Sequence, residues 1–325
     1  MFSPLPERER RVRRQTPKDR LMDEHIQRLR ERIQELKLER KAIILAHNYQ
    51  REEVQDVADR VGDSLELARW AAQSEAEVIV LCGVHFMAES AKILNPTRTV
   101  LLPEAAAGCP MAEMIDVEDL RQWKARYPQA KVVCYVNSSA AVKAESDICC
   151  TSSNALKVVE SLDARQILFV PDQHLGQWVS RQTSKEIILY PGYCVTHQRL
   201  KREHIEAARA AHPGALLVAH PECAAEIVDL ADAVLSTSGM LRYVKESPGR
   251  LFLVGTEAGI LHRMRLENPD KVFYSASNAL LCPNMKKTHL KSVVLALERN
   301  QYEITVPEEI RLRAKAALDR MLAVS

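Results

Sequence analysis

The sequence lacks the patterns that mark several large classes of protein. No apolar run approaches the roughly 20 residues that a membrane-spanning helix requires, and the charged N-terminal stretch has no apolar core like that of a secretory signal. The ten glycines include no GxG pair, and no Walker A sequence occurs, so neither NAD nor ATP has a recognisable phosphate loop. We therefore expect a cytoplasmic protein with no membrane partner.

A strong excess of charge is also missing. The formal net charge is +2, so the whole molecule has no field that would favour nucleic acid as a partner. Residues 1–40 are a local exception with twelve Lys and Arg, although eight acids offset them. We interpret this polar N-terminal extension as a solvated tail leading into a polar helix, and a nucleic-acid or targeting arm is the alternative.

What the chain does contain is an α/β pattern. Over 325 residues, short apolar runs rich in β-branched residues alternate with amphipathic helical stretches, which is typical of parallel strands with crossover helices. The predicted strands are 42–46, 78–82, 100–103, 132–136, 148–151, 167–170, 187–190, 216–219, 233–236, 251–254 and 272–275.

Three groups of residues recur with one period. The cysteines that end LLPEAAAGC, ILYPGYC and FYSASNALLC lie 194 − 109 = 85 and 282 − 194 = 88 residues apart. Polar residues separated by one position form a second landmark, followed by a hydroxyl residue at a constant interval (64 − 49 = 152 − 137 = 237 − 222 = 15). These sets are His47, Tyr49 and Ser64; Tyr135, Asn137 and Ser152; and His220, Glu222 and Thr237. Strands that end near Val84, Asp172 and Glu257 form a weaker third landmark.

This recurrence predicts three similar α/β/α, Rossmann-like units with parallel sheets around a pseudo-threefold axis. We expect residues 41–105 with 272–325 to form the first unit, closed by both chain ends, 106–186 the second and 187–271 the third. Ligands in such units collect beyond the carboxyl ends of the strands, where all the landmark residues lie.

Equivalent positions around a threefold axis converge, so Cys109, Cys194 and Cys282 are predicted to hold a metal. Proline follows Cys109 and Cys282, which suggests helix N-termini that favour the thiolate form. Zinc with a fourth ligand and a 4Fe-4S cluster with one open iron both remain possible. We expect Cys82, Cys134 and Cys149 to be buried hydrophobes, and Cys223 to serve in packing rather than in reactivity.

The polar ring above this metal suits an anionic substrate. Hydroxyls and backbone amides at helix N-termini bind carboxylate and phosphate groups, and a His and Glu pair can transfer protons. The residue pattern alone leaves open a hydro-lyase acting on a small polycarboxylate, a zinc-dependent aldolase, and a non-catalytic iron-sulfur sensor.

Eight motifs in order resemble one family, the quinolinate synthases. They are LAHNYQ, GDSLELA, LPEAAAGCPMAE, YVNSSAAVKAESDICCTSSNA, PGYCVTHQR, HPEC, STSGM and CPNMKKT, and the similarity extends from about Ala42 to Asn300. The resemblance implies a transferase of de novo NAD biosynthesis that condenses iminoaspartate with dihydroxyacetone phosphate to quinolinate, releasing phosphate and water. It further implies a 4Fe-4S cluster on the three cysteines, whose open iron acts as a Lewis acid. L-Aspartate oxidase or aspartate dehydrogenase would be possible sources of iminoaspartate.

The resemblance also assigns roles. Glu222, His220, Tyr49 and Tyr135 are the candidate catalytic residues, with Glu222 as the general acid/base. The candidate substrate-binding residues are His47, Ser64, Tyr135, Asn137, Ser152, His197, His220, Glu222 and Thr237. One departure is that Ala276 and Ala279 replace the extra cysteines of a CxxCxxC run found in some members, so only Cys282 can serve as the third ligand.

Overall fold

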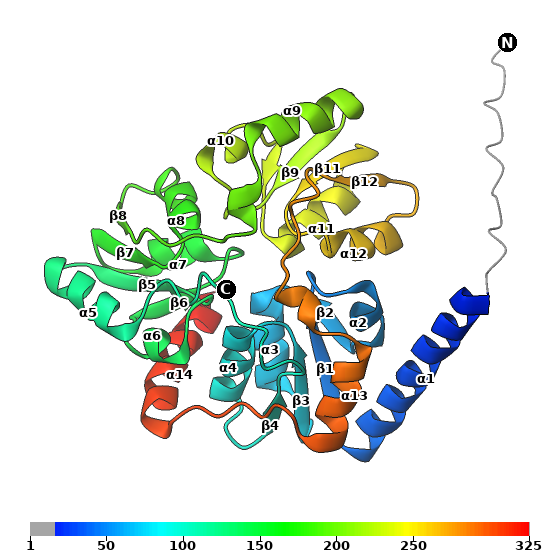
Figure 1. The fold of residues 1–325 in the computed structure, drawn as a ribbon. Helices are drawn as coiled ribbons and strands as arrows, with labels where there is room; N and C mark the ends of the chain where they lie inside the picture. Colours follow the sequence, from blue (N-terminus) through cyan, green and yellow to red (C-terminus); the bar gives the residue numbers. More distant parts are fainter. Residues whose placement is uncertain (1–16, 325) are drawn as a thin grey trace, which may run out of the picture.

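The computed structural model describes residues 17–324, and the run of arginines between positions 10 and 14 lies outside them. The described chain forms three α/β units arranged around a common centre (Figure 1). Each unit contains a four-stranded parallel sheet in which the second strand lies at one edge, followed by the first, third and fourth. The α/β fold predicted from the repeat is therefore confirmed.

Each sheet uses four consecutive strands. The first contains β1 (Ala42–His47), β2 (Arg60–Gly62), β3 (Val78–Cys82) and β4 (Thr99–Leu101). The second contains β5 (Lys131–Tyr135), β6 (Ile148–Cys150), β7 (Gln166–Val170) and β8 (Glu186–Leu189). The third contains β9 (Leu216–Ala219), β10 (Ala233–Val234), β11 (Leu251–Gly255) and β12 (Val272–Ser275). All eleven predicted strands are present, and β2 is the strand that the prediction missed.

Helices connect and cover these strands. They are α1 (Pro17–Glu39), α2 (Glu52–Val57), α3 (Ser64–Gln73), α4 (His85–Leu94), α5 (Val117–Arg126), α6 (Ala140–Ala144), α7 (Ala155–Ser161), α8 (Gln173–Ser180), α9 (Arg202–Ala211), α10 (Ala225–Val228), α11 (Thr237–Glu246), α12 (Ile260–Glu267), α13 (Leu290–Arg299) and α14 (Glu308–Val324). Two 3-10 helices, η1 (His197–Arg199) and η2 (Met285–Lys287), follow cysteines. Within residues 17–324, no helix combines the length and the apolar character needed to span a membrane.

The constant spacing of the landmarks has a structural cause in a repeated aspartate. In each unit a carboxylate just before the second strand accepts a hydrogen bond from a backbone N–H of the first strand, and its own N–H donates back to the same residue. The pairs are Asp59 with Ile44, Asp147 with Val132 and Asp232 with Leu217, with N to Oδ2 distances of 2.8, 2.8 and 2.7 Å. This double contact sets the register between the two strands, so the residues after them keep a fixed separation.

Two expected unit boundaries are corrected by the sheets. β8 belongs to the second sheet and β12 to the third, although the expected divisions after residues 186 and 271 assigned most or all of each strand to the following unit. Each strand that precedes a repeated cysteine is the last strand of its own sheet. The expected divisions placed these two strands at the start of a unit, whereas in the structure each is the last strand of the preceding sheet.

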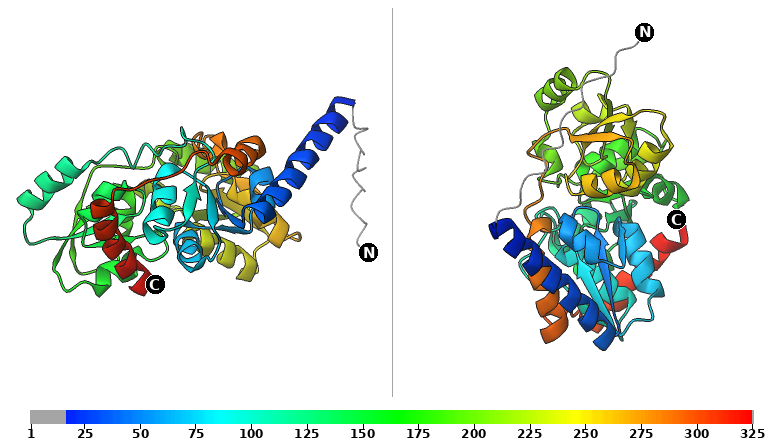
Figure 2. Two further views of the ribbon diagram at one scale, coloured as in Figure 1. Left: turned by 90° about the horizontal axis from the view of Figure 1, so that it is seen from below. Right: turned by 90° about the vertical axis from the view of Figure 1, so that its right-hand side faces the viewer.

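Segments near both ends of the described chain pack on the first unit, but the C-terminal helix α14 packs mainly on the second, which corrects the expectation that residues 272–325 complete the first unit. α1 packs along α13, and α13 also contacts β3 (Figure 2). Residues 302–304 run antiparallel to β4, with Leu102 N–H bonded to the carbonyl of Tyr302. The chain then crosses to the second unit, where α14 packs against α6, β6 and α7 while still contacting α4.

Candidate functional site

One cavity at the centre of the molecule is lined by residues from all three landmarks. In each unit the polar pair lies at or just beyond the end of the first strand, the hydroxyl residue follows the second and the cysteine follows the fourth. The parallel strands therefore present these residues at one end of their sheets. All thirteen residues predicted for the site line this cavity, together with Asp63, Thr151, Thr196, Glu257 and Met285, among others.

The three cysteines share one backbone conformation. Each carbonyl accepts a hydrogen bond from the N–H four residues later, from Glu113, Gln198 and Lys286 to Cys109, Cys194 and Cys282 respectively. The helical backbone predicted after Cys109 and Cys282 is present, but each of the three cysteines begins a single helical turn and not a longer helix. Backbone N–H groups of Met111 and Ala112 still point at the Cys109 sulfur.

The same cysteines differ from the rest in exposure. Cys109, Cys194 and Cys282 are partly exposed at the cavity, whereas the other five cysteines are buried in the core, as expected for Cys82, Cys134, Cys149 and Cys223. Burial raises the pKa of the Cys109 thiol to about 12. A bound cation is what would hold such a sulfur as a thiolate at neutral pH. This cavity therefore fits a thiolate-ligated metal group.

Cys194 lies in a second potential ligand group. One ligand atom each from Cys194, His197 and Glu222 lies within 4.8 Å of the other two. His197 Nδ1 is 3.1 Å from the Cys194 sulfur and 2.7 Å from Glu222 Oε2. These residues could hold a metal ion or face one held by the cysteines.

Glu222 is the most densely bonded acid of the cavity. Its carboxylate accepts a hydrogen bond from the Tyr135 hydroxyl at 2.6 Å, and His220 Nδ1 lies 3.6 Å from Oε2. Burial by itself would raise the pKa of Glu222, but its interactions with His197 and His220 and the hydrogen bonds from His197 and Tyr135 outweigh it and hold the pKa below its ordinary value. Burial and the Glu222 charge also raise the pKa of Tyr49 and of Tyr135 well above 10.

His47 and His220 occupy equivalent places with equivalent contacts. In each case the ring Nδ1 accepts the backbone N–H two residues later, from Tyr49 at 3.2 Å and from Glu222 at 3.3 Å. Burial lowers the pKa of His47 to about 4 and that of His220 to about 3, so both rings are neutral at pH 7. The remaining nitrogen, Nε2, is the one that His220 directs at the Ser152 hydroxyl, 3.2 Å away.

Thr256 contacts two residues of the cavity and was missed by sequence reasoning. Its hydroxyl lies 2.5 Å from the Tyr49 hydroxyl and 2.8 Å from His197 Nε2, so one side chain joins the loop after β1 to the segment that follows Cys194. The only signal was its place beside Glu257, the weakest of the repeated landmarks.

The hydroxyl residues Ser64, Ser152 and Thr237, together called the hydroxyl wall, line the cavity at or just before the starts of α3, α7 and α11. Asn48 Nδ2 donates to the Thr237 hydroxyl at 3.1 Å. Asp63, also missed, caps α3 through the N–H groups of Leu65 and Glu66 and accepts the Ser153 hydroxyl at 2.5 Å. Asn137 Oδ1 is buried and has no hydrogen-bond partner among residues 17–324, so it is available to a ligand.

Comparisons with known proteins agree with the motifs. A family described as "Quinolinate synthetase A protein" matches residues 31–323. The chain is 55% identical over 295 residues to the quinolinate synthase of Thermodesulfovibrio yellowstonii, covering 90% of this chain and 97% of the relative. It is 56% identical over 296 residues to that of Geobacter metallireducens (91% and 97%) and 57% identical over 293 residues to that of Dehalococcoides mccartyi (90% and 97%).

Proposed function

Because this chain belongs to the quinolinate synthase family and is a quinolinate synthase of NAD biosynthesis, we propose how its cavity performs the reaction. The substrates would be iminoaspartate and dihydroxyacetone phosphate, joined with loss of phosphate and water. L-Aspartate oxidase or aspartate dehydrogenase would supply the imine. The observation that carries the proposal is the convergence of three partly exposed cysteines on one cavity lined by histidines and hydroxyls.

Cys109, Cys194 and Cys282 would hold a 4Fe-4S cluster with one iron free of a protein ligand. Ligands of a single tetrahedral zinc ion lie about 3.8 Å apart, given zinc–sulfur bonds of about 2.3 Å. Among the described residues, the group with ligand atoms within 4.8 Å of one another is Cys194, His197 and Glu222, not the three cysteines. This wider arrangement supports a multinuclear cluster over zinc. When bound, an open iron supplies Lewis-acid polarisation of a departing hydroxyl.

The chain's own residues would transfer protons and orient the intermediate. Glu222 is ionised and buried beside Tyr135, so it can accept a proton from carbon or nitrogen and return it to a leaving oxygen. Tyr49 and Tyr135 keep their protons at neutral pH and can donate hydrogen bonds to developing negative charge. Neutral His220 would orient Glu222, and His197 would lie between the intermediate and the cysteine side of the cavity.

Carboxylate and phosphate groups would bind at the hydroxyl wall. Ser64, Ser152 and Thr237 come from three different units, and each lies at or just before the start of a helix, where the helix dipole favours a bound anion. His47 would add a ring nitrogen, and the unpartnered Asn137 side chain an amide.

The test is quinolinate formation from iminoaspartate and dihydroxyacetone phosphate by anaerobically reconstituted protein, measured before and after exposure to air. We expect turnover that disappears in air together with the iron. No turnover despite a full cluster would contradict the proposal and point to a hydro-lyase, which would be recognised by its products. Zinc in place of iron in the active protein would contradict the cluster.

A further inference from the structure

A buried ion pair lies beside the third cysteine and takes no part in the proposed chemistry. Glu257 is fully buried, and its carboxylate accepts the Cys282 N–H at 3.1 Å through Oε1 and the Gly259 N–H at 2.7 Å through Oε2. Lys286 Nζ lies 3.0 Å from Oε1 and 3.2 Å from Oε2. A buried carboxylate is costly unless it is paired and hydrogen-bonded, and here both of its oxygens have partners.

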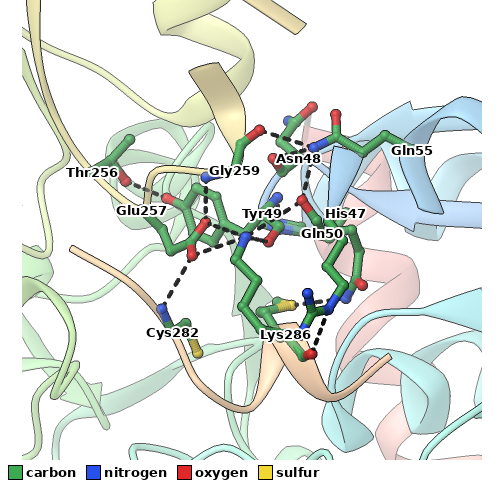
Figure 3. A network of polar contacts seen from close by, with 12 residues as sticks. His47, Asn48, Tyr49, Gln50, Gln55, Thr256, Glu257, Gly259, Cys282 and Lys286 are labelled. Carbon is green, nitrogen blue, oxygen red and sulfur yellow. Dashed lines mark hydrogen bonds and ion pairs between the residues drawn. The ribbon is translucent and has the colours of Figure 1, made fainter. Parts of the chain in front are cut away.

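The ammonium group of Lys286 also joins a different unit. It donates to the carbonyl of Tyr49 at 2.5 Å and lies 3.4 Å from that of Gln50, in the loop that follows β1 (Figure 3). One cation therefore connects the turn that carries a predicted cluster ligand to the loop that carries a candidate catalytic tyrosine. Gln55 Nε2 reinforces the contact by donating to the carbonyls of Gln50 and Gly259 at 2.9 Å each.

The packing around this pair leaves no spare room. A Cβ atom added at Gly259 would lie 2.7 Å from Lys286 Nζ and 2.7 Å from the Tyr49 carbonyl oxygen. Such a contact is shorter than carbon and oxygen atoms tolerate, so a glycine is needed for the three segments to approach. Close approach of this kind limits how far the lysine can move.

The second unit has the carboxylate but uses it differently. Asp172 follows β7 as Glu257 follows β11, and it bonds the N–H groups of His174, Leu175 and Cys194. Its Oδ2 atom has no partner in the described chain, whereas both Glu257 oxygens contact a lysine. In the first unit the equivalent position is Val84. In the second and third units, a carboxylate therefore contacts the turn that carries the cysteine. In the third unit, Lys286 also connects this carboxylate to the loop that carries Tyr49.

We propose that Glu257 and Lys286 are positioning residues that fix the Cys282 turn against the Tyr49 loop. The cluster ligand and the catalytic tyrosine thereby keep a constant position relative to each other. The inference rests on the proposed function, since it concerns the same cavity. Neither residue needs to touch the substrate. Breaking the pair releases the turn from its own unit and from the first unit at the same time.

The test compares Glu257→Gln, Lys286→Met and the double variant, each reconstituted anaerobically as the full chain. Because misplacement of a reacting group by about 1 Å can cost roughly 100-fold, we expect each single variant to lower kcat by about 10- to 100-fold. KM should stay within about threefold of the wild-type value, because the variants leave the hydroxyl wall unchanged. A higher KM would require the loss of hydrogen bonds between that wall and the substrate. Iron should also be lost to a chelator severalfold faster.

The double variant tests whether Glu257 and Lys286 act through one shared interaction or have two independent structural roles. Residues that act through one interaction are non-additive, so the double variant should be no worse than the poorer single variant. Multiplied losses, or unchanged kcat and iron retention in both single variants, would overturn the proposal. Lys41→Met and Glu77→Gln break an exposed lysine–glutamate pair on the same unit as Tyr49 and should change none of these quantities.

A measurement without metal keeps this inference distinct from the proposed function. In the metal-free full chain, alkylation of Cys282 by iodoacetamide is compared with that of Cys194 by mass spectrometry. We expect the Cys282 to Cys194 rate ratio to rise severalfold in Glu257→Gln and in Lys286→Met, and an unchanged ratio would contradict the inference. If the wild type fails to hold iron or to form quinolinate, the proposed function fails while this ratio still tests the pair.

Discussion

At the scale of single residues, the cysteines divide into two groups by environment. Cys194 is partly exposed beside His197 and Glu222, while Cys134 is buried within β5. We predict that Cys194→Ala loses activity and bound iron together, because two thiolates do not replace three as ligands. Cys134→Ala removes one buried sulfur and should keep both properties. Iron analysis and quinolinate assay check this, and full iron in Cys194→Ala would contradict the ligand assignment.

A substitution at Glu222 should affect catalysis without affecting metal binding. Glu222→Gln keeps the side-chain volume and can still accept the Tyr135 hydrogen bond, but an amide cannot carry the proton. We expect unchanged iron content and a kcat lowered by about 100- to 10,000-fold, the usual share of a general acid or base. A normal rate in the variant would remove Glu222 from that role.

The buried histidine His47 should make the fold sensitive to mild acid. Burial lowers its folded-state pKa to about 4, whereas the unfolded chain titrates near 6.5. The contribution of neutral His47 to the free energy of unfolding is therefore complete above pH 6.5. It is lost as the pH falls toward 4, at up to about 1.4 kcal/mol per pH unit. Urea unfolding of metal-free protein between pH 7 and 4 should show a shallower slope for His47→Gln. Parallel slopes would show that His47 takes up its proton equally in both states.

At the scale of elements, α14 holds two units together. Ala314, Ala317, Leu318 and Met321 are fully buried on one side of this helix, which packs on α6 and β6 of the second unit and on α4 of the first. Its other side is open, as Leu312 is 54% exposed. The helix therefore packs on both units and connects them.

We predict that Leu318→Ala lowers the free energy of unfolding by about 2–5 kcal/mol, because it leaves a cavity where the helix meets its neighbours. Leu312→Ala on the same helix is the control and should change stability by less than about 0.5 kcal/mol. Urea denaturation of both variants measures the difference. Equal losses would mean that α14 is not packed as described.

One strand and the length of the cysteine turns could not be predicted from sequence. β2, Arg60–Gly62, contains a single apolar side chain, Val61, so it lacks the apolar run that identified the equally short β6. Proline after Cys109 and Cys282 correctly indicated helical backbone, but not that it would end after one turn. How many turns follow depends on where the next segment packs, and this is a tertiary property.

At the scale of the whole molecule, the internal repeat made most of the cavity predictable. Residues after equivalent strands had to converge, so spacing alone brought Tyr49, Asn137 and Glu222 to one centre. Thr256 was different, since its hydroxyl contacts Tyr49, which lies in another unit and at another position of the repeat. A period in the sequence indicates which residues are equivalent, but contacts between non-equivalent residues appear only once the three units are assembled.

Because the hydroxyl wall is assembled from all three units, each unit should contribute separately to substrate binding. Ser64→Ala, Ser152→Ala and Thr237→Val each remove one hydroxyl from a different unit. A hydrogen bond to a charged group is worth about 1.5–3 kcal/mol, so we expect KM to rise about 10-fold or more in each variant with a smaller change in kcat. Ser161→Ala, whose hydroxyl bonds the Val158 carbonyl outside the cavity, is the control. If only one of the three raised KM, the anionic groups would bind within a single unit, and the threefold arrangement would serve the cysteines alone.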